Sequence, residues 1–360
     1  MIGIISFHCP YNYGSALQAW AMQTKLEQLG YPCKILNYYY EHDMRNYDIR
    51  WYARRLPVIA YDLLIYPAMQ RKKRAFHAFH AAHLHLTPQT RDWTDLAELS
   101  RDCDTLICGS DQIWNYDLTE GLHPAYFLDF AHAGQRRIAY APSVNQEQIQ
   151  ESIGKQFQEK LRDYHAVSVR EADTASQLTE LLGKPVEAVL DPTLLLEARD
   201  YLPLLQKCSL RLPERYVFFY CLHQDHLKFL CKSAEQYAAE HHVKIVYCSK
   251  MDLFRPEYAC NIFRQGPEAF VYAIAHAEYV LADSFHAAAF SVIYHKDFAI
   301  CAPGGCNSRL HSLFSSLGLP DRLIREPGTY LPPIDYAPVD LCLNTRREES
   351  LSYLTSALKE

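Results

Sequence analysis

The stretch IGIISFHCPYNYGSALQAWAMQTKLEQLG, residues 2–30, contains the unit from which the fold is predicted. Residues 2–7 are mostly apolar and predict a short buried strand, which a loop, residues 8–14, follows. Apolar residues then recur at steps of three and four, as on one face of a helix: Ala16, Ala19, Met22, Leu26 and Leu29. Gly30 comes next, and glycine commonly ends a helix. The stretch therefore predicts a strand, a loop and a helix, the repeating unit of a parallel sheet.

The same alternation recurs along the chain and predicts its domains. Further apolar runs predict strands at residues 33–38, 104–111, 136–143, 165–171, 186–192, 216–222, 243–249, 278–284 and 297–301. Helix-period segments lie between them, and a break with two prolines spans residues 197–216. We expect an α/β protein of two Rossmann-like domains facing a cleft, residues 1–200 and 201–345. A last helix, residues 346–360, can pack on either domain.

Composition excludes several classes of protein. The 360 residues are 49% hydrophobic and 22% charged, which is ordinary for a globular protein. No run approaches the roughly 18–20 apolar residues of a membrane helix, and the first residues lack the features of a signal peptide. A net charge of -6 gives no reason to expect nucleic acid. The twelve cysteines include no Cys-x-x-Cys pair, so we expect buried free thiols and a cytoplasmic protein.

One segment is locally basic. RKKRAFHAFHAAHLHL, residues 71–86, joins four cations to two phenylalanines and four histidines. It allows a phosphate contact, a peripheral membrane contact or a metal site on three histidines: His77, His80 and His83. Their spacing of three turns them around a helix rather than onto one point, so a solvated amphipathic helix with Phe76 and Phe79 inward is favoured over a metal site.

Polar residues follow several of the predicted strands, at the sheet edge where α/β proteins bind ligands. In HCPYNYGSALQ, Asn12 and Gly14 can turn the chain and offer backbone N–H groups to an anion or a sugar hydroxyl. The alternative is an Asn/Gly turn in which Ser15 caps the helix. The segment is not a Gly-x-Gly-x-x-Gly dinucleotide fingerprint.

A second candidate is CGSDQIWN, residues 108–115. Ser110 and Asp111 allow close backbone approach, and Gln112 and Trp114 offer hydrogen bonds and a flat apolar face. Polar groups beside an indole are typical of carbohydrate or nucleotide pockets. The alternative places Asp111 as a helix cap and Trp114 in the core.

Two arginines follow predicted strands or begin predicted helices. Arg170 leaves the strand AVSV and can grip a carboxylate or phosphate with two N–H groups. The alternative is an ion pair with Glu171 or Asp173. Arg309 lies in GGCNSRLHSLF, residues 304–314, which predicts either an anion-binding helix N-terminus or a capped surface helix.

The stretch VLADSFHAAAF, residues 280–290, places Ser284 and His286 between a strand and a helix. A histidine in the first turn of a helix at a strand end is suited to exchange a proton. Ser284 is a weaker nucleophile candidate, because residues two apart rarely bring a hydroxyl and an imidazole together and no Gly-x-Ser-x-Gly elbow is present. We expect Ser284 to cap the helix or to bind a phosphate group of the substrate. The alternative is a structural histidine.

These five segments, in this order, resemble the polysaccharide pyruvyl transferase family. The similarity covers almost the whole chain and rests on residues 3–31, on DTLICGSDQIWN, on VSVRE followed by VLDPTLLL, and on residues 266–298 around Ser-Phe-His. The resemblance implies a fold like that of the GT-B glycosyltransferases, with the site between two Rossmann-like domains.

The resemblance also implies the chemistry: transfer of the pyruvyl group of phosphoenolpyruvate onto a sugar, giving a pyruvate ketal. The acceptor would be a cell-surface polysaccharide or its lipid-linked precursor, and neither a metal nor an organic cofactor is required. His286 would donate the proton that the methylene carbon needs. Arg170 matches the family's arginine that holds the donor.

The chain departs from the family pattern at one position. Many members have Arg-Leu-His where this chain has Ser284, Phe285 and His286. The histidine is retained, the donor-binding arginine is absent, and Arg309 or Lys250 are the candidates to replace its charge. A GT-B-type glycosyltransferase with a nucleotide-sugar donor, and a non-catalytic glycan-binding relative, are the alternatives to a pyruvyl transferase.

Overall fold

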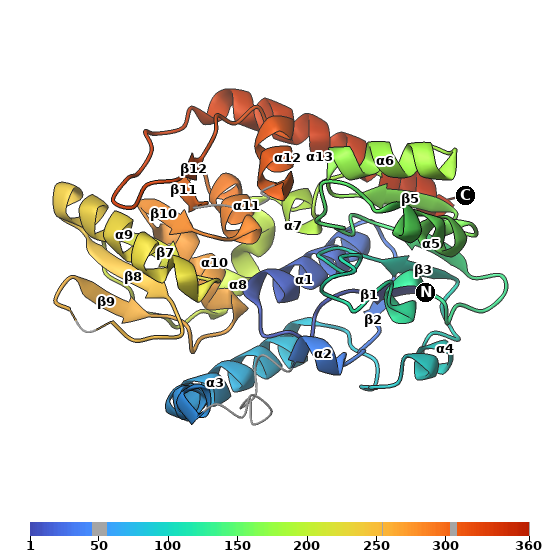
Figure 1. The fold of residues 1–360 in the computed structure, drawn as a ribbon, viewed down its shortest axis with the longest axis horizontal. Helices are drawn as coiled ribbons and strands as arrows, with labels where there is room; N and C mark the ends of the chain where they lie inside the picture. Colours follow the sequence, from blue (N-terminus) through green and yellow to red (C-terminus); the bar gives the residue numbers. More distant parts are fainter. Residues whose placement is uncertain (45–55, 254, 303–307, 360) are drawn as a thin grey trace.

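Two parallel β-sheets covered by helices form the molecule (Figure 1). The computed structural model describes residues 1–44, 56–253, 255–302 and 308–359. The first sheet has the strand order β2-β1-β3-β4-β5-β6 and the second has the order β12-β11-β10-β7-β8-β9. The predicted α/β fold of two Rossmann-like units is therefore confirmed.

The strands of the first sheet are β1 (Ile2–Ile5), β2 (Cys33–Ile35), β3 (Thr105–Cys108), β4 (Arg136–Ala139), β5 (Ala166–Val169) and β6 (Glu187–Ala188). Those of the second are β7 (Tyr216–Tyr220), β8 (Lys244–Cys248), β9 (Tyr258–Asn261), β10 (Tyr279–Ala282), β11 (Asp297–Cys301) and β12 (Leu323–Ile324). Only β9 and β12 were not expected. Strand β9 is half-exposed and strand β12 has two residues, so neither produces a clear apolar run.

Helices cover both sheets. Up to the end of the first sheet they are α1 (Tyr13–Gln28), α2 (Glu41–Met44), α3 (Leu56–His83), α4 (Leu96–Leu99), α5 (Glu151–Leu161), α6 (Ala172–Leu182) and α7 (Pro192–Leu195). The later ones are α8 (Leu202–Lys207), α9 (Leu227–His241), α10 (Pro267–His276), α11 (Phe285–Ile293), α12 (Ser308–Ser316) and α13 (Tyr336–Lys359). Short 3₁₀ helices span Trp93–Asp95, Pro124–Phe127, Ala198–Tyr201 and Gln224–His226. The expected break therefore contains two short helical segments.

Each sheet has a point where the strand order reverses. In the first sheet, β1 and β3 are neighbours and end side by side, with Ile5 opposite Cys108. In the second, β7 and β10 are neighbours, with Tyr220 opposite Ala282. Loops that leave such neighbouring strands diverge and open a crevice, which is where α/β proteins bind ligands.

The C-terminal helix α13 runs back along the first sheet (Figure 1). Arg346 donates to the carbonyl of Ala188 at 2.7 Å, and the Tyr353 hydroxyl donates to the carbonyl of Ala139 at 2.9 Å. These contacts show that the last helix packs on the first sheet unit. Because α13 begins at Tyr336, the expected division between residues 345 and 346 falls inside a helix; the domain boundaries stay a prediction.

Helix α3 has the amphipathic character expected of residues 71–86. Phe76 and Phe79 are fully buried, as predicted. In the described part of the chain, no group of three or more histidines, cysteines or acidic residues has the arrangement of a metal site. Likewise, none of the described helices combines the length and apolar character needed to cross a membrane. The cysteines of the described ranges are all free thiols, and Cys306 lies outside those ranges.

Two buried histidines, His8 and His80, make the free energy of unfolding depend on pH. Their ring centroids lie 6.1 Å apart. Burial lowers the pKa of both, that of His80 to about 3 with further lowering by His8 and His77. The unfolded chain binds protons at these histidines near pH 6.5, whereas the folded chain does not until the pH is far lower. Acid therefore favours the unfolded state.

We expect the free energy of unfolding to fall by about 2 kcal/mol between pH 7.5 and 5 through His80 alone. Urea unfolding of the wild type and of His80→Leu at both pH values measures this. The leucine variant should show the shallower pH dependence, while His85→Leu, on an exposed side chain, should keep the wild-type slope. Equal slopes for the wild type and His80→Leu would contradict the assignment.

Candidate active site

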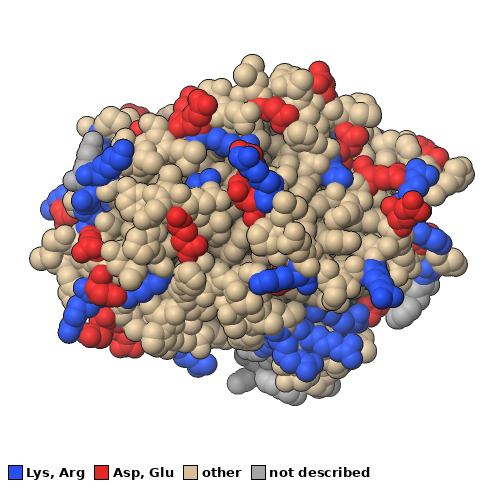
Figure 2. All heavy atoms as spheres, turned by 180° about the vertical axis from the view of Figure 1, so that it is seen from behind, with Lys and Arg blue, Asp and Glu red and all other residues tan. Residues whose placement is uncertain are grey.

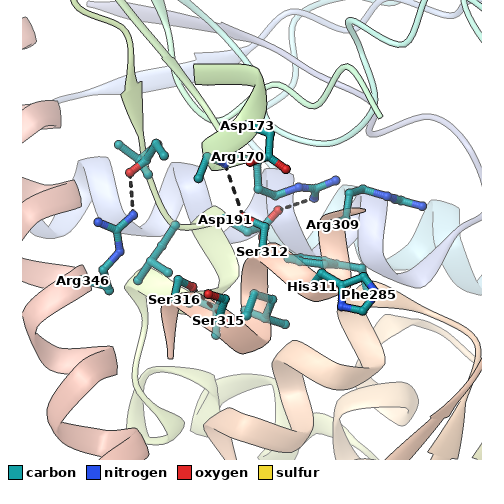
Figure 3. A pocket seen from close by; sticks show the side chains of 16 residues that line it. Arg170, Asp173, Asp191, Phe285, Arg309, His311, Ser312, Ser315, Ser316 and Arg346 are labelled. Atoms are coloured by element: carbon teal, nitrogen blue, oxygen red, sulfur yellow. Dashed lines mark hydrogen bonds and ion pairs between the residues drawn. The ribbon is translucent and has the colours of Figure 1, made fainter. Parts of the chain in front are cut away.

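A cavity of about 530 Å³ lies where the two sheet units meet (Figure 3). The first unit supplies Arg170 after β5 and Asp191 at the start of α7, and the second supplies Phe285, Arg309 and His311 from α11 and α12. Arg346 of α13 lines the opposite end from Arg309 in the view of Figure 3. We call this space the Arg170 cavity. Its charged groups come from segments far apart in the sequence.

Arg170 is held on three sides. Its Nη1 donates to Oδ2 of Asp191 at 3.0 Å, and its Nε lies 3.6 Å from Oε1 of Glu171. The guanidinium carbon lies 4.3 Å from the centroid of the Phe285 ring, which is within cation–π range. Burial works to lower the pKa of Arg170, but Glu171, Asp191 and Asp111 outweigh it and raise the pKa. The guanidinium therefore stays charged.

Two nitrogen atoms of the same guanidinium make no hydrogen bond in the described structure. Among the described residues, neither Nε nor Nη2 of Arg170 has a hydrogen-bond acceptor, although both are buried. A buried charged donor left unsatisfied costs free energy, and native structures rarely tolerate one without a functional reason. Because Arg170 lines the cavity, these donors are suited to an anionic ligand. The predicted ion pair with Glu171 is present, and the grip on an anion stays a prediction.

Asp191 is the central carboxylate of the site and was given no role by the sequence analysis. Its Oδ2 accepts from Ser110 Oγ at 3.0 Å as well as from Arg170. Its Oδ1 caps α7 by accepting from the backbone N–H and the hydroxyl of Thr193, at 3.0 and 2.7 Å. Burial works to raise the pKa of Asp191, but His286, Arg170 and Thr193 outweigh it and hold the pKa well below its usual range. Asp191 is therefore ionised.

His286 lies in the first turn of α11, on the other side of Asp191. Its Nε2 is 3.7 Å from Asp191 Oδ2, too far for a hydrogen bond, and this buried atom has no hydrogen-bond partner among the described residues. Ser284 is the N-cap residue of α11 by backbone conformation, without a side-chain capping bond, and it is buried. Arg170 and His286 thus share one carboxylate.

The imidazole of His286 also packs directly on Gly14 of the first unit. A methyl group built on Gly14 would lie 2.1 Å from Nδ1 of His286 and 2.4 Å from Cγ. Nothing larger than a hydrogen atom fits between them. The glycine of the Asn-Tyr-Gly segment is therefore required by the approach of the second unit, and the structure brings Gly14 and His286 together.

In the loop after β1, a side chain caps the following helix and occupies a backbone N–H group. Asn12 caps α1, because its Oδ1 accepts from the backbone N–H of Gly14 at 2.9 Å. Ser15, the expected cap, instead donates to Oδ2 of Asp111 at 2.7 Å. Asp111 has a φ of 66° and caps no helix through its side chain in the described structure. It joins the loop after β3 to α1.

Gln112 and Trp114 lie away from the Arg170 cavity. Gln112 accepts a hydrogen bond from Asn115 at 2.8 Å. Trp114 is fully buried, donates to the carbonyl of Tyr126 at 3.1 Å and stacks on Phe127 at 5.0 Å. The core interpretation of Trp114 thus agrees with the structure, which leaves the indole no face for a ligand.

The two candidates for the missing positive charge lie in different places. Arg309, on α12, lines the Arg170 cavity, and Figure 3 shows it at the same end as Arg170. Lys250 lines a separate, smaller pocket beside Asn12. Residues 304–307 of the predicted anion-binding segment lie outside the described residues.

We expect Gly14→Ala to lower the free energy of unfolding by about 1–3 kcal/mol, because the methyl group overpacks the imidazole. In a His286→Ala background the ring is absent. There Gly14→Ala should lower the free energy of unfolding less, or even raise it, since glycine is a poorer helix former than alanine. Urea unfolding of the four proteins of this double-mutant cycle measures the coupling. Equal costs in both backgrounds would show that the close contact does not constrain residue 14.

Comparison with solved structures identifies the fold. A UDP-N-acetylglucosamine 2-epimerase from Rickettsia bellii aligns with a TM-score of 0.50 and 10% identity, over 99% of this chain and 95% of that chain. The S. aureus MnaA–UDP co-structure aligns with a TM-score of 0.50 and 9% identity, over 98% and 90%. The expected GT-B-like arrangement is thereby confirmed. Comparison with curated protein sequences gave no match.

Comparison with family profiles identifies the protein's relatives. The profile described as polysaccharide pyruvyl transferase matches residues 12–304, a range that contains Gly14, Arg170, Asp191 and His286. This match confirms the resemblance seen in the sequence. The chain belongs to the polysaccharide pyruvyl transferase family and is a transferase.

Proposed function

We propose that the protein transfers the pyruvyl group of phosphoenolpyruvate onto a sugar of a cell-surface polysaccharide or its precursor, giving a pyruvate ketal. The observation that carries the proposal is the buried guanidinium of Arg170, which lines the 530 Å³ cavity and has two nitrogen atoms without a hydrogen bond in the described structure. Phosphoenolpyruvate offers a phosphate and a carboxylate, the groups that arginine binds with paired hydrogen bonds.

Arg309 supplies the second cation in this proposal. It lines the same cavity from α12, whereas the arginine of many family members would stand at Ser284. The positive charge then enters from the neighbouring helix of the second unit. Phe285, the residue after Ser284, holds the guanidinium of Arg170 against its ring. Two arginines, one from each unit, can thus offset part of the negative charge on the phosphate and the carboxylate of one donor.

His286 is the proton donor. The ionised Asp191, 3.7 Å from Nε2, attracts a protonated imidazole in this buried setting. The imidazolium gives its proton to the methylene carbon of the donor, so that carbon 2 becomes electrophilic. A sugar hydroxyl adds to carbon 2 and loses its proton to the imidazole. The bond from carbon 2 to the phosphate then breaks, and a second hydroxyl forms the other bond to this carbon and gives its proton to the inorganic phosphate. Asp191 positions both His286 and Arg170.

Phosphate release from phosphoenolpyruvate should depend on a saccharide acceptor and on these residues. We expect kcat/KM to fall about 100- to 1,000-fold in Arg170→Met and about 100-fold or more in His286→Gln. Arg309→Met should mainly raise the KM for phosphoenolpyruvate, by about 10-fold or more. Arg101→Met, on an exposed side chain, is the charge-matched control.

Two results would contradict this assignment. Acceptor-dependent phosphate release by folded His286→Gln at the wild-type rate would remove the proton-donor role. A thermal shift by UDP-, GDP- or CMP-sugars but not by phosphoenolpyruvate would favour a nucleotide-sugar donor, since a bound donor raises Tm. Saccharide binding without turnover of any donor would indicate a non-catalytic glycan-binding protein.

We also propose that α3 brings the enzyme to an anionic membrane surface, where a lipid-linked acceptor would lie. Figure 2 shows lysine and arginine side chains gathered over this helix, which carries Arg71 and Arg74 on its exposed side. Leu63 and Leu64 of the same helix are 48% and 71% exposed. Exposed apolar side chains beside cations are typical of helices that lie on a membrane surface.

Sedimentation with phosphatidylglycerol-containing vesicles tests this contact. We expect Arg71→Glu/Arg74→Glu to reduce the vesicle-bound fraction at least several-fold, because each cation contributes about 1 kcal/mol near an anionic surface. Binding should weaken with added salt and be absent with neutral vesicles. An Arg199→Glu control, on an exposed side chain outside α3, should bind as the wild type; vesicle binding that is unaffected by the α3 variant would contradict the proposal.

A further inference from the structure

A second, smaller pocket lies beside the start of α1, and the proposed reaction makes no use of it. Its volume is about 130 Å³, and its lining includes Asn12, Lys72, Tyr220, Lys250 and Phe263. These residues come from the cap of α1, from α3, from the end of β7 and from the segments that follow β8 and β9. We call it the Lys72 pocket. It lies at the carboxyl ends of β7, β8 and β9, the edge of the sheet where α/β proteins bind ligands.

Lys72 is a buried cation without a counter-charge. It is 5% exposed, and in the described part of the chain its ammonium group has neither a hydrogen bond nor an ion pair. Its nearest recorded contacts are aromatic faces: Nζ lies 4.5 Å from the ring centroids of Tyr13 and of Phe263. Cation–π contacts offset part of the cost of burying an ammonium group, but they supply no negative charge.

The lining of the pocket is positively charged. Lys250 lies close enough to Lys72 to repel it, and the described lining contains two lysines and no aspartate or glutamate. The cap of α1 also borders the pocket, and the N-terminus of a 16-residue helix adds a partial positive charge. A buried ammonium group beside a second, half-buried lysine is suited to an anion that binds near both.

The size of the pocket limits the anion. The pocket is small, with a volume of about 130 Å³, and suits a single phosphate group with the rest of the ligand outside it. Its position relates it to the reaction, because Asn12 lines the pocket while Gly14 touches His286. Their Cα atoms are at most about 7.6 Å apart along two peptide units.

We infer that the Lys72 pocket binds a phosphate group carried by the saccharide acceptor. A phosphate held there by Lys72 and Lys250 anchors the acceptor about one sugar's length from His286, so that the hydroxyls of the attached sugar reach the proton donor. The binding of phosphate in this pocket is independent of the proposed pyruvyl transfer; its assignment to the acceptor rests on that proposed function.

The charge of Lys72 makes this site sensitive to pH. Burial lowers the pKa of Lys72 to about 8, with Cys248 raising it and Lys250 lowering it further. Burial also raises the pKa of the Cys248 thiol to about 11 and the pKa values of Tyr13 and Cys221. The remaining titratable groups that border the pocket are Tyr11, Tyr220 and Lys250. The nearby carboxylate of Asp283, after β10, accepts hydrogen bonds from the backbone N–H groups of Leu222 and His223. Anion affinity should therefore fall as the pH rises through about 8.

Calorimetric titration of the full chain with inorganic phosphate tests the pocket itself. In the Arg170→Met variant, which lacks the donor arginine, phosphate should still bind. Adding Lys72→Met should raise that Kd about 10- to 100-fold, the value of a charge-assisted hydrogen bond, whereas adding Lys155→Met, on an exposed helical lysine, should not. With sulfate, whose charge is constant, the affinity should drop between pH 7 and 9. An unchanged Kd in Lys72→Met overturns the inference.

Diffraction from crystals soaked in tungstate gives a second measurement in case Arg170→Met does not fold. An anomalous peak beside Lys72 Nζ in the wild type, absent in Lys72→Met, is the expected result. Tungstate at Arg170 alone overturns the inference.

Kinetics test the assignment of the phosphate to the acceptor. Lys72→Met should raise the KM for a saccharide phosphate at least about 10-fold and leave the KM for the same saccharide without phosphate, and the KM for phosphoenolpyruvate, unchanged. Equal changes for both saccharides would overturn the assignment and indicate that free phosphate is the ligand. If the wild type transfers no pyruvyl group at all, the proposed function fails, while the phosphate titration still decides whether the pocket binds phosphate.

Discussion

The site depends on one buried carboxylate, that of Asp191. It accepts hydrogen bonds from Arg170, Ser110 and Thr193, and it lies 3.7 Å from His286. Three of these groups belong to the first sheet unit and the fourth belongs to the second, so the ion pairs of Asp191 cross between the units. A buried charge is tolerated only with such partners, and removing one partner of a buried pair typically costs about 3–5 kcal/mol. The contacts of Asp191 therefore fix the geometry of the site and hold the two units together.

Backbone packing reinforces this electrostatic link. The strand-order reversals of the two sheets face each other, and the segments that leave them meet where Gly14 contacts the imidazole of His286. The imidazole is then confined between a backbone that admits no side chain and a carboxylate that attracts its proton. Preorganisation of this kind lowers the reorganisation that a charged transition state requires. It also explains why an Asn-Tyr-Gly loop matters to the site although the N–H of Gly14 already donates to Asn12.

Sequence periodicity predicted the sheets and most helices because buried parallel strands and amphipathic helices require apolar residues at fixed spacings. It predicted the place of Arg170 because a residue that follows a buried strand emerges at the ligand edge of the sheet. It could not assign Asp191, since Asp-Pro-Thr has the pattern of a helix cap and the residue performs both roles. Nor could it decide between a ligand-stacking and a core position for Trp114, because both need an apolar neighbourhood. Contacts between residues as distant as Gly14 and His286 leave no local pattern.

With Ser-Phe-His at residues 284–286, a different residue, Arg309, supplies a positive charge to the cavity in the proposed function. Asp191 and Glu171 offset much of the charge of Arg170, and Arg346 is engaged with Glu349 and the carbonyl of Ala188. In the proposed reaction, phosphoenolpyruvate would need a further cation, and Arg309 lines the cavity just beyond the range that matches the family profile. Phe285 complements this arrangement, since its ring fixes the guanidinium of Arg170 without adding charge. In the proposed function, Arg309 brings its charge from α12, whereas an arginine at residue 284 would bring it at the start of α11. The cavity then has a second cation although residue 284 is a buried serine.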